Sequence, residues 1–373
     1  MQFAVRGHRA IPLAAAAAIL VTLTACGDGD DEASETSTSP PTTESATTTV
    51  ASTTGSSTTP TTATSTVVDT SVVDTTATTA APTTTDAPAD DRTIVAVDEQ
   101  TALALLSIGV APDHVLTTLN SETFAALNAD LGIPAIDFAI AEPSFEVVAG
   151  LAPDLLVGIE NPSLVERADE WAQVAPLVTT PVDASWQDQL QLLATEFAAE
   201  EQAAALVAAV DAVQADVAQA LADSDAAGSS VSLLTVRIGN ILAINASGAT
   251  GELLTAVGLT RPAAQLAEGP PGIPFAPVSP ETIGDHDADL VLLGEGINFD
   301  LTPLIESPIY NQLDAVQRSA DQGVVGDAWV LGGTGFATYW VLQDLVDILV
   351  DGGEPAGFDD TSSRWASFLE LTS

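Results

Sequence analysis

The sequence predicts an α/β fold of two lobes, each built on a parallel sheet, joined by one long helix with a cleft between the lobes. Three features carry this prediction. Short apolar segments alternate with segments of helical period through residues 92–185. Residues 187–223 then run without Gly or Pro, and the alternation resumes after Gly228. Continuous apolar strands that alternate with amphipathic helices are typical of a parallel sheet covered on both faces.

In the first lobe, short apolar segments have the length and residue types of buried strands. The predicted strands cover residues 93–98 (TIVAVD), 114–119 (HVLTTL), 154–159 (DLLVGI) and 177–180 (LVTT). The segments between them have helical period. The predicted helices cover residues 99–108, 144–151 and 163–174.

Residues 187–223 are rich in Ala, Leu, Gln and Glu, which are strong helix formers. They predict one uninterrupted helix of about 37 residues, near 55 Å long at about 1.5 Å per residue. In the second lobe, strands are predicted at residues 231–236 and 289–293, and helices at 250–257 and 338–350.

The N-terminus has the pattern of an export signal. A basic start containing Arg6 and Arg9 precedes an uncharged, mostly apolar run over residues 11–25. This run is shorter than the about 20 residues that a membrane-spanning helix needs, and it fits a signal-peptide core. Cys26 is the only cysteine of the chain, so no disulfide can form within it. The alternative to a lipid anchor is an ordinary signal peptide that contains a cysteine.

Residues 23–27 (LTACG) resemble a bacterial lipobox. The resemblance implies cleavage before Cys26 and a diacylglyceryl thioether on its sulfur. Two acyl chains matter because a single chain gives only marginal, reversible membrane binding. We therefore expect lipidation of Cys26 and a protein anchored to the outer face of the cytoplasmic membrane, at the cell surface or in the periplasm.

The segment after Cys26 is biased to Thr, Ser, Ala, Pro and Asp, and it lacks apolar periodicity. Such a chain cannot bury enough apolar surface to offset its ordering entropy, so we expect a disordered tether, with Thr and Ser residues open to O-glycosylation. Its root-mean-square span is roughly 40–50 Å. The predicted boundaries are 1–25 for the signal peptide, 26–91 for the anchor and linker, 92–185 for the N-terminal lobe, 186–223 for the connecting helix and 224–373 for the C-terminal lobe.

The charge is strongly negative. The chain has 8 basic and 52 acidic residues, a net charge of −44, and every basic residue is Arg. This field opposes binding to nucleic acid and to anionic lipid. The acids are scattered rather than clustered, so a solvated acidic surface is favoured over cation capture.

The residues also argue against a bare metal site and against catalysis. Beyond the signal peptide the only histidines are His114 and His286, too few for a typical zinc or manganese site. We expect no metal ligands and no cofactor. No nucleophile elbow with a Ser-His-Asp order and no paired-carboxylate signature stands out, so we expect no catalytic residues and a protein that is not an enzyme.

Four segments carry a family resemblance, and together they span residues 92 to about 350. They are residues 145–157 (FEVVAGLAPDLLV), 251–262 (GELLTAVGLTRP), 279–291 (SPETIGDHDADLV) and 307–313 (SPIYNQL). They resemble segments of periplasmic-binding-protein-type-III receptors, which serve ABC importers of ferric siderophores, haem and cobalamin.

This resemblance implies a monomeric solute-binding lipoprotein that captures an iron-siderophore-like chelate and delivers it to an ABC permease and its ATPase. Iron would then arrive already chelated, and no chemistry would be performed on it. Two alternatives stay open. One is a cobalamin or haem receptor of the same fold. The other is a surface-anchored binding or sensory module without a transporter. A third and more distant alternative is an enzyme on a doubly wound fold.

The ligand cleft is expected where the carboxyl ends of the strands of both lobes face each other, since ligands bind beyond those ends in open parallel sheets. The predicted rim comprises Asp98, Glu99, Asn120, Glu160, Asn161, residues 237–240, Glu295, Gly296 and residues 332–339. Within it we expect ligand contacts from Arg237, Glu160, Asn161 and Asn240, with Phe336 and Tyr339 stacking on a planar ligand.

Arg237 ends a predicted strand in a chain with few cations. The resemblance implies that an arginine on this strand contacts an anionic ligand, and a guanidinium forks well onto carboxylate, hydroxamate or catecholate oxygens. The alternative is a structural arginine paired to a nearby acid. For Arg261, in a turn between Thr260 and Pro262, a structural role is expected. For Trp171, Trp186, Trp329 and Trp340, packing is expected.

Glu146 and Glu281 occupy equivalent helix-start positions in the two lobes. The resemblance implies that they dock onto arginine pockets of the permease. The alternative is simpler, because an acid near a helix N-terminus is favoured by the helix dipole.

Overall fold

The computed structural model describes residues 91–138, 144–269, 273–296 and 299–373, without the side chains of residues 162–163. The chain divides into two units, and all described residues belong to the unit formed by residues 77–373. Cys26 and most of the predicted linker lie outside the described residues.

The first sheet has five parallel strands in the order β3-β2-β1-β4-β5, as the sequence predicts for a parallel α/β lobe. Its strands are β1 (Ile94–Ala96), β2 (His114–Thr117), β3 (Ala135–Asp137), β4 (Leu155–Ile159) and β5 (Leu177–Thr180). Its helices are α1 (Glu99–Ser107), α2 (Glu122–Leu131), α3 (Phe145–Gly150), α4 (Pro162–Glu166) and α5 (Ala168–Trp171). The predicted helix over 163–174 is therefore two short helices, and β3 and α2 were not predicted.

Alternate residues of the central strands enter different cores. Val95 and Leu156 belong to a cluster with Trp171, whereas Ile94 and Leu155 belong to the main core of the protein. Since successive side chains of a strand point to opposite faces, a strand covered on both faces needs an apolar residue at every position. This requirement explains the continuous apolar runs that predict the strands.

The stretch from residue 187 to 223 forms two helices, so the expectation of one uninterrupted helix is wrong. Helix α6 (Trp186–Glu196) ends at Phe197, and α7 (Glu200–Ala222) follows. Ala198 takes a φ of +52°, and the N–H of Ala199 donates to the carbonyl oxygen of Ala194 at 2.8 Å. This hydrogen bond is typical of a Schellman helix end, which usually has Gly at the left-handed position. The long helix that joins the lobes is α7.

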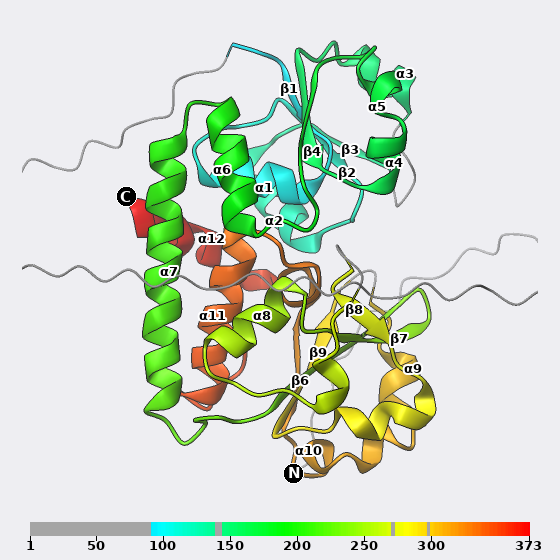
Figure 1. Cartoon of the computed structure of the whole chain (residues 1–373), viewed down its shortest axis with the longest axis vertical. Helices are drawn as coiled ribbons and strands as arrows, with labels where there is room; N and C mark the ends of the chain where they lie inside the picture. Colours follow the sequence, from blue (N-terminus) through cyan, green and yellow to red (C-terminus); the bar gives the residue numbers. More distant parts are fainter. Residues whose placement is uncertain (1–90, 139–143, 270–272, 297–298) are drawn as a thin grey trace, which may run out of the picture. The chain divides into compact units, whose positions relative to one another are not determined.

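Helix α7 lies along α11 (Gly335–Leu349), and Figure 1 shows the two helices side by side. Leu206, Val210 and Leu221 of α7 are buried in the main core. Within the described ranges, α7 is the one helix long and apolar enough to cross a membrane by length and composition alone.

The second sheet is mixed, with the order β10-β9-β6-β7-β8. Its strands are β6 (Val231–Arg237), β7 (Asn240–Ile244), β8 (Phe275–Pro277), β9 (Leu290–Glu295) and β10 (Asp321–Val325). β9 and β6 are parallel, as predicted, and β10, which was not predicted, is parallel to β9. Strand β7 pairs antiparallel with both β6 and β8. Ile238 and Gly239 form the two-residue turn between β6 and β7 with φ values of 49° and 73°. Such a turn forces an antiparallel pair.

Short helices complete the C-terminal lobe. They are α8 (Ala249–Ala256), η1 (Ala263–Gln265), η2 (Pro280–His286), α9 (Thr302–Ile305), η3 (Tyr310–Gln312), α10 (Asp314–Gln317), the π-helix η4 (Asp327–Leu331), η5 (Phe358–Asp360), α12 (Thr361–Leu369) and η6 (Glu370–Thr372). Helix α11 begins three residues before its predicted start because the Thr334 side chain caps it by accepting a hydrogen bond from the N–H of Ala337 at 3.0 Å.

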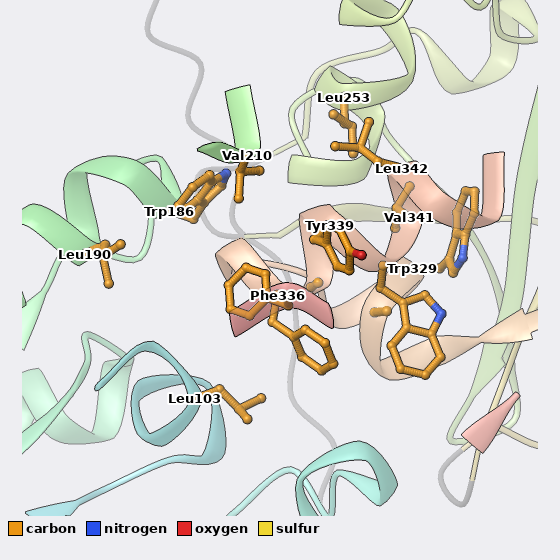
Figure 2. Packing of buried hydrophobic residues seen from close by; sticks show 14 of the residues in the cluster. Leu103, Trp186, Leu190, Val210, Leu253, Trp329, Phe336, Tyr339, Val341 and Leu342 are labelled. Atoms are coloured by element: carbon orange, nitrogen blue, oxygen red, sulfur yellow. The ribbon is translucent and has the colours of Figure 1, made fainter. Parts of the chain in front are cut away.

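The main core continues across both lobes. Figure 2 shows Leu103 of α1, Trp186 of α6 and Val210 of α7 around Phe336 and Tyr339 of α11, all members of one buried cluster. A close-packed core resists rearrangement. The lobes are thus held together behind the strand ends, and the position of the residues at these ends is largely fixed.

Candidate functional site

The predicted rim residues Asp98 and Glu99 stabilise loops of the N-terminal lobe. Asp98 caps α1 by accepting the N–H of Thr101 at 2.6 Å, and it also accepts the N–H of Ile159 at 3.0 Å. Glu99 is 1% exposed and accepts the N–H groups of Leu119 and Ser121. Burial raises the pKa of both carboxyl groups. These contacts shape the loop between β2 and α2, in which the rim residue Asn120 adopts a φ of +53°.

This loop touches the other lobe through Asp327, the first residue of η4. One carboxylate oxygen of Asp327 accepts the Oγ–H of Ser121 and the N–H of Thr123, each at 2.9 Å. Nearby, Gln100 Nε2 donates to the carbonyl oxygens of Leu331 and Gly332 at 3.1 and 2.7 Å. Sequence reasoning missed Asp327 because β10, the strand that it follows, was not predicted.

Arg237 lies at the carboxyl end of β6 between two aromatic rings. Its guanidinium carbon is 5.9 Å from the ring centre of Phe275 and 5.7 Å from that of Phe299. Of the arginines in the described ranges, it is the one whose guanidinium makes no hydrogen bond or ion pair to another described residue. Burial lowers its pKa, and the charge of Asp327 acts in the opposite direction. The geometry therefore does not favour the alternative, in which Arg237 forms a structural ion pair with a nearby acid.

Two glycines let Phe299 lie close to this arginine and to Asp327. A Cβ at Gly326 would meet the Phe299 ring at 2.7 Å, and one at Gly296 would meet it at 2.9 Å. The Cβ at Gly296 would also lie 3.3 Å from Oε2 of Glu122, which belongs to the N-terminal lobe. The rim residue Gly296 therefore lies where the two lobes meet.

The other polar residues that were predicted to contact the ligand form hydrogen bonds within their own lobes. Asn240 faces Arg237 across the hairpin, and its side chain donates to the carbonyl oxygen of Ile238 at 3.2 Å. Glu160 accepts the hydroxyl of Thr179 at 3.2 Å, and Asn161 accepts the N–H of Leu164 at 2.9 Å. Glu160 and Asn161 follow β4 in the N-terminal lobe. The structure thus brings Asn240, but neither Glu160 nor Asn161, next to Arg237.

Phe336 and Tyr339 are core residues in this structure, with 3% and 6% of their surface exposed. The Phe336 ring lies 4.9 Å from that of Trp365, and the Tyr339 ring lies 5.7 Å from that of Phe368. The first turns of α11 are covered by α12, and the cavities that Phe336 lines measure only about 10 and 30 Å³, which is too small for a planar ligand. The predicted stacking role is not supported, and we leave both residues out of the proposed ligand contacts.

The residues expected to be structural are buried. Arg261 donates to the carbonyl oxygens of Asn245 and Ile244 at 3.0 and 2.5 Å. Burial lowers its pKa to about 10. Trp329 donates through Nε1 to Asp344 at 2.8 Å, and the other three core tryptophans, Trp171, Trp186 and Trp340, are also buried. These packing predictions are confirmed.

A cavity of about 440 Å³ lies at the carboxyl ends of β2 and β3. Its lining includes Asn120, Ser121, Glu122 and Asp137. Ser121 and Glu122 are also the residues that reach Asp327 and Gly296 of the other lobe. This volume is in the range of small-molecule sites, about 300–1,000 Å³. Across the described part of the chain, no three His, Cys, Asp or Glu residues are grouped as a metal site would require.

Two α/β lobes in contact, with an arginine at a strand end of one lobe and a cavity at strand ends of the other, define a two-lobed solute-binding protein. The profile of the family described as Periplasmic binding protein matches residues 94–319, and the chain belongs to this family. This membership gives it a substrate-binding role rather than an enzymatic one, as the sequence predicts, and an extracytoplasmic setting.

Solved structures show the same fold at low sequence identity. SirA of Staphylococcus aureus is 21% identical with a TM-score of 0.58, over 68% of this chain and 97% of SirA. Unliganded FhuD2 of the same organism is 17% identical with a TM-score of 0.59, over 70% and 100%. The triscatecholate siderophore binding protein FeuA of Bacillus subtilis, complexed with ferri-bacillibactin, is 17% identical with a TM-score of 0.58, over 70% and 93%. No curated protein matches the chain.

Proposed function

We propose that this chain is the solute-binding lipoprotein of an ABC importer and that it captures an iron-siderophore-like chelate between its lobes. The observation that carries the proposal is Arg237. Its guanidinium lies at a strand end between two aromatic rings, without a hydrogen-bond partner among the described residues. A half-buried guanidinium of this kind is suited to fork onto the oxygen atoms of a chelate.

The surroundings of Arg237 support this choice. The rings of Phe275 and Phe299 hold the guanidinium by cation–π contacts, which limits the freedom it would lose on binding a ligand. A cavity of about 440 Å³ in the N-terminal lobe, whose lining residue Ser121 contacts Asp327 of the other lobe, gives space for a compact organic chelate. Solved relatives of this fold include SirA in complex with staphyloferrin B and FhuD2 with bound ferrioxamine B.

Delivery to the permease and its ATPase would use one acid of each lobe. Glu146 and Glu281 are exposed in the first turns of α3 and η2, each two residues after an extended serine N-cap. The Ser144 hydroxyl donates to Glu146 at 2.7 Å, and this hydrogen bond lowers the pKa of Glu146. This hydrogen bond favours the charged form of Glu146, and both side chains are accessible to arginine side chains of a permease.

The lipid on Cys26 would hold the protein at the outer face of the membrane, and residues 26–91 would give the lobes their reach. These two parts of the proposal, the lipid anchor and the linker, rest on the sequence alone. A tether spanning roughly 40–50 Å lets anchored lobes meet a permease in the same membrane.

The test is a titration of the detergent-solubilised full chain with ferrioxamine B, ferric staphyloferrin B, ferri-bacillibactin, haem and cobalamin, read by tryptophan fluorescence and by calorimetry. We expect one ferric siderophore to bind with sub-micromolar affinity. Arg237→Ala should weaken its binding about tenfold or more, because a charge-assisted hydrogen bond is lost. Arg318→Ala, a change at an exposed arginine, is the matched control and should bind like the wild type.

Binding of haem or cobalamin alone would move the assignment to a receptor for that ligand. No binding of any compound, or full affinity in Arg237→Ala, would contradict the proposal as stated. Tight binding of a chelate without any loss of iron uptake on deletion of the gene would favour a surface-anchored module without a transporter.

A further inference from the structure

We propose that Asp327 is a specificity-determining residue that makes the site select ferric chelates of little or no negative charge. This inference rests on the proposed function, because it concerns the ligand that Arg237 would contact. It specifies the net charge of the chelate, which the fold alone does not determine.

The carboxylate of Asp327 is fixed from the opposite lobe. Ser121, which caps α2, donates its hydroxyl proton to Oδ2 of Asp327, and the N–H of Thr123 donates to the same oxygen. Two hydrogen bonds from one lobe therefore hold a charge that belongs to the other lobe.

Asp327 is held beside the arginine by the packing of Phe299. The Phe299 ring lies 5.7 Å from the guanidinium carbon of Arg237, and it lies so close to Gly326 that a Cβ there would meet it at 2.7 Å. Asp327 is the next residue in the chain. The negative charge of Asp327 also opposes the fall in the pKa of Arg237 that burial causes, which agrees with this proximity.

A second carboxylate reaches the same place. Oε2 of Glu122 lies close to Gly296, whose neighbour in space is again Phe299. The ring of Phe299 thus lies against Gly326, which precedes Asp327, and against Gly296, beside Glu122. The carboxylate of Asp327 offsets the charge of Arg237, so the positive potential that would attract a multiply charged anion is reduced, while the guanidinium keeps its N–H donors for oxygen acceptors of a ligand.

The consequence is a charge preference. A ferric trihydroxamate core is uncharged, and a pendant ammonium makes ferrioxamine B a monocation. A ferric tris-catecholate such as ferri-bacillibactin is a trianion, because three doubly charged catecholates surround Fe³⁺. We infer that the site takes the hydroxamate type, since the carboxylate of Asp327 beside Arg237 leaves little net positive charge to hold a trianion.

The experiment compares three chelates on the full chain in detergent at low salt: ferrioxamine B, its N-acetyl derivative, which lacks the ammonium charge, and ferri-bacillibactin. Wild type should bind both hydroxamates more tightly than the trianion. Asp327→Asn keeps the size of the side chain and an oxygen acceptor for Ser121 and Thr123. It should raise the affinity for the trianion relative to the N-acetyl derivative about tenfold. The gain should shrink at about 0.5 M salt because charges are then screened.

Two controls separate the charge effect from a loss of contact between the lobes. Asp211→Asn removes the same charge from the exposed face of α7 and should leave the ranking of the chelates unchanged. Gln100→Ala removes two other hydrogen bonds between the lobes, to Leu331 and Gly332, and keeps the charge of Asp327, so it should also leave the ranking unchanged.

An unchanged ranking in Asp327→Asn would overturn the inference. A shift of the same size in Gln100→Ala would also overturn it, because the effect would then come from the contact between the lobes. A wild type that binds the trianion most tightly would overturn the inference and leave the proposed function standing. A wild type that binds none of the three, nor any other chelate of the panel, would overturn the proposed function, and the inference with it.

Discussion

Ile238 is the residue with the least favourable backbone in the hairpin that carries Arg237. Its φ of +49° is in the left-handed region, and its side chain is 83% exposed. A β-branched residue at such a φ is strained, by about 1–2 kcal/mol. Turns of this type favour Asn followed by Gly, and here Gly239 already holds the second position.

We predict that Ile238→Asn stabilises the protein, because Asn tolerates a positive φ and the exposed Ile side chain has little packing to lose. The expected gain is about 1 kcal/mol, or about 2–4 °C in Tm for a domain of this size. Differential scanning calorimetry measures it. Ile305→Asn changes another exposed isoleucine, 44% exposed and without a positive φ, and should bring no such gain. A variant at 238 that melts at or below the wild-type temperature would contradict the prediction.

At the scale of single residues, the sequence predicted positions at strand ends better than it predicted contacts. Arg237 was found because a cation follows a clear apolar strand. Asp327 was missed because β10 (DQGVV) begins with polar residues and contains a glycine, so it lacks an apolar run. Phe336 and Tyr339 follow a glycine-rich turn that predicts a helix start. Nothing local to that turn shows that α12 covers their rings.

A buried network joins three helices behind the site. Asp344 of α11 accepts Nε1–H of Trp329 at 2.8 Å and the N–H of Ala356 at 3.0 Å. Arg364 of α12 donates to Asp344 at 3.1 Å and to Asp347 at 2.6 Å. Burial raises the pKa of Asp344 to about 6 in spite of these partners. Trp329 belongs to η4, so this network also supports the helix that begins with Asp327.

The raised pKa predicts a pH dependence of stability. The unfolded value is near 3.8, so between about pH 4 and 6 the folded state binds more protons at Asp344 than the unfolded state does. The favourable contribution is complete below the unfolded pKa and is lost as the pH rises through the folded one. Lowering the pH from 8 to 5 should therefore stabilise wild type by about 1.5 kcal/mol relative to Asp344→Asn.

Urea unfolding of both proteins at several pH values measures this difference, and other titrating groups cancel in it. The matched control is Asp359→Asn, at an exposed aspartate of η5, and a pH-dependent difference of the same size in this variant would contradict the assignment to Asp344. A constant difference between wild type and Asp344→Asn would show that Asp344 titrates near its ordinary pKa.

At the scale of elements, the predicted strands and helices of the first lobe lie within a few residues of the observed ones, because buried parallel strands need apolar residues at every position. The break between α6 and α7 could not be predicted from Phe197, Ala198 and Ala199. None of these residues breaks a helix, and the helix ends there because the chain changes direction in the tertiary structure. The antiparallel pairing of β6 and β7 could not be predicted either, because the turn between them has Ile at the position where Asn is usual.

At the scale of the whole fold, the two lobes were predictable because the same alternation of segments appears twice around a stretch without Gly or Pro. Their shared core was not predictable. Leu103, Trp186 and Phe336 are far apart in the sequence and meet in one cluster. This core implies that the lobes move little relative to each other, so one acid on each lobe can be presented to a permease at a nearly constant spacing.

That constant spacing leads to a prediction for Glu146 and Glu281 together. Reversing both charges, as Glu146→Lys with Glu281→Lys, should abolish iron uptake in cells, while the affinity of the purified full chain for its chelate stays within about twofold of wild type. Each single reversal should reduce uptake in part, because lost charge pairs at two separate contacts add. Glu201→Lys with Glu354→Lys makes the same change of charge at exposed positions outside α3 and η2, and should support normal uptake.

Equal uptake by the docking variant and this control would exclude docking through these acids. Loss of chelate binding in the docking variant would instead place the two glutamates in the ligand site.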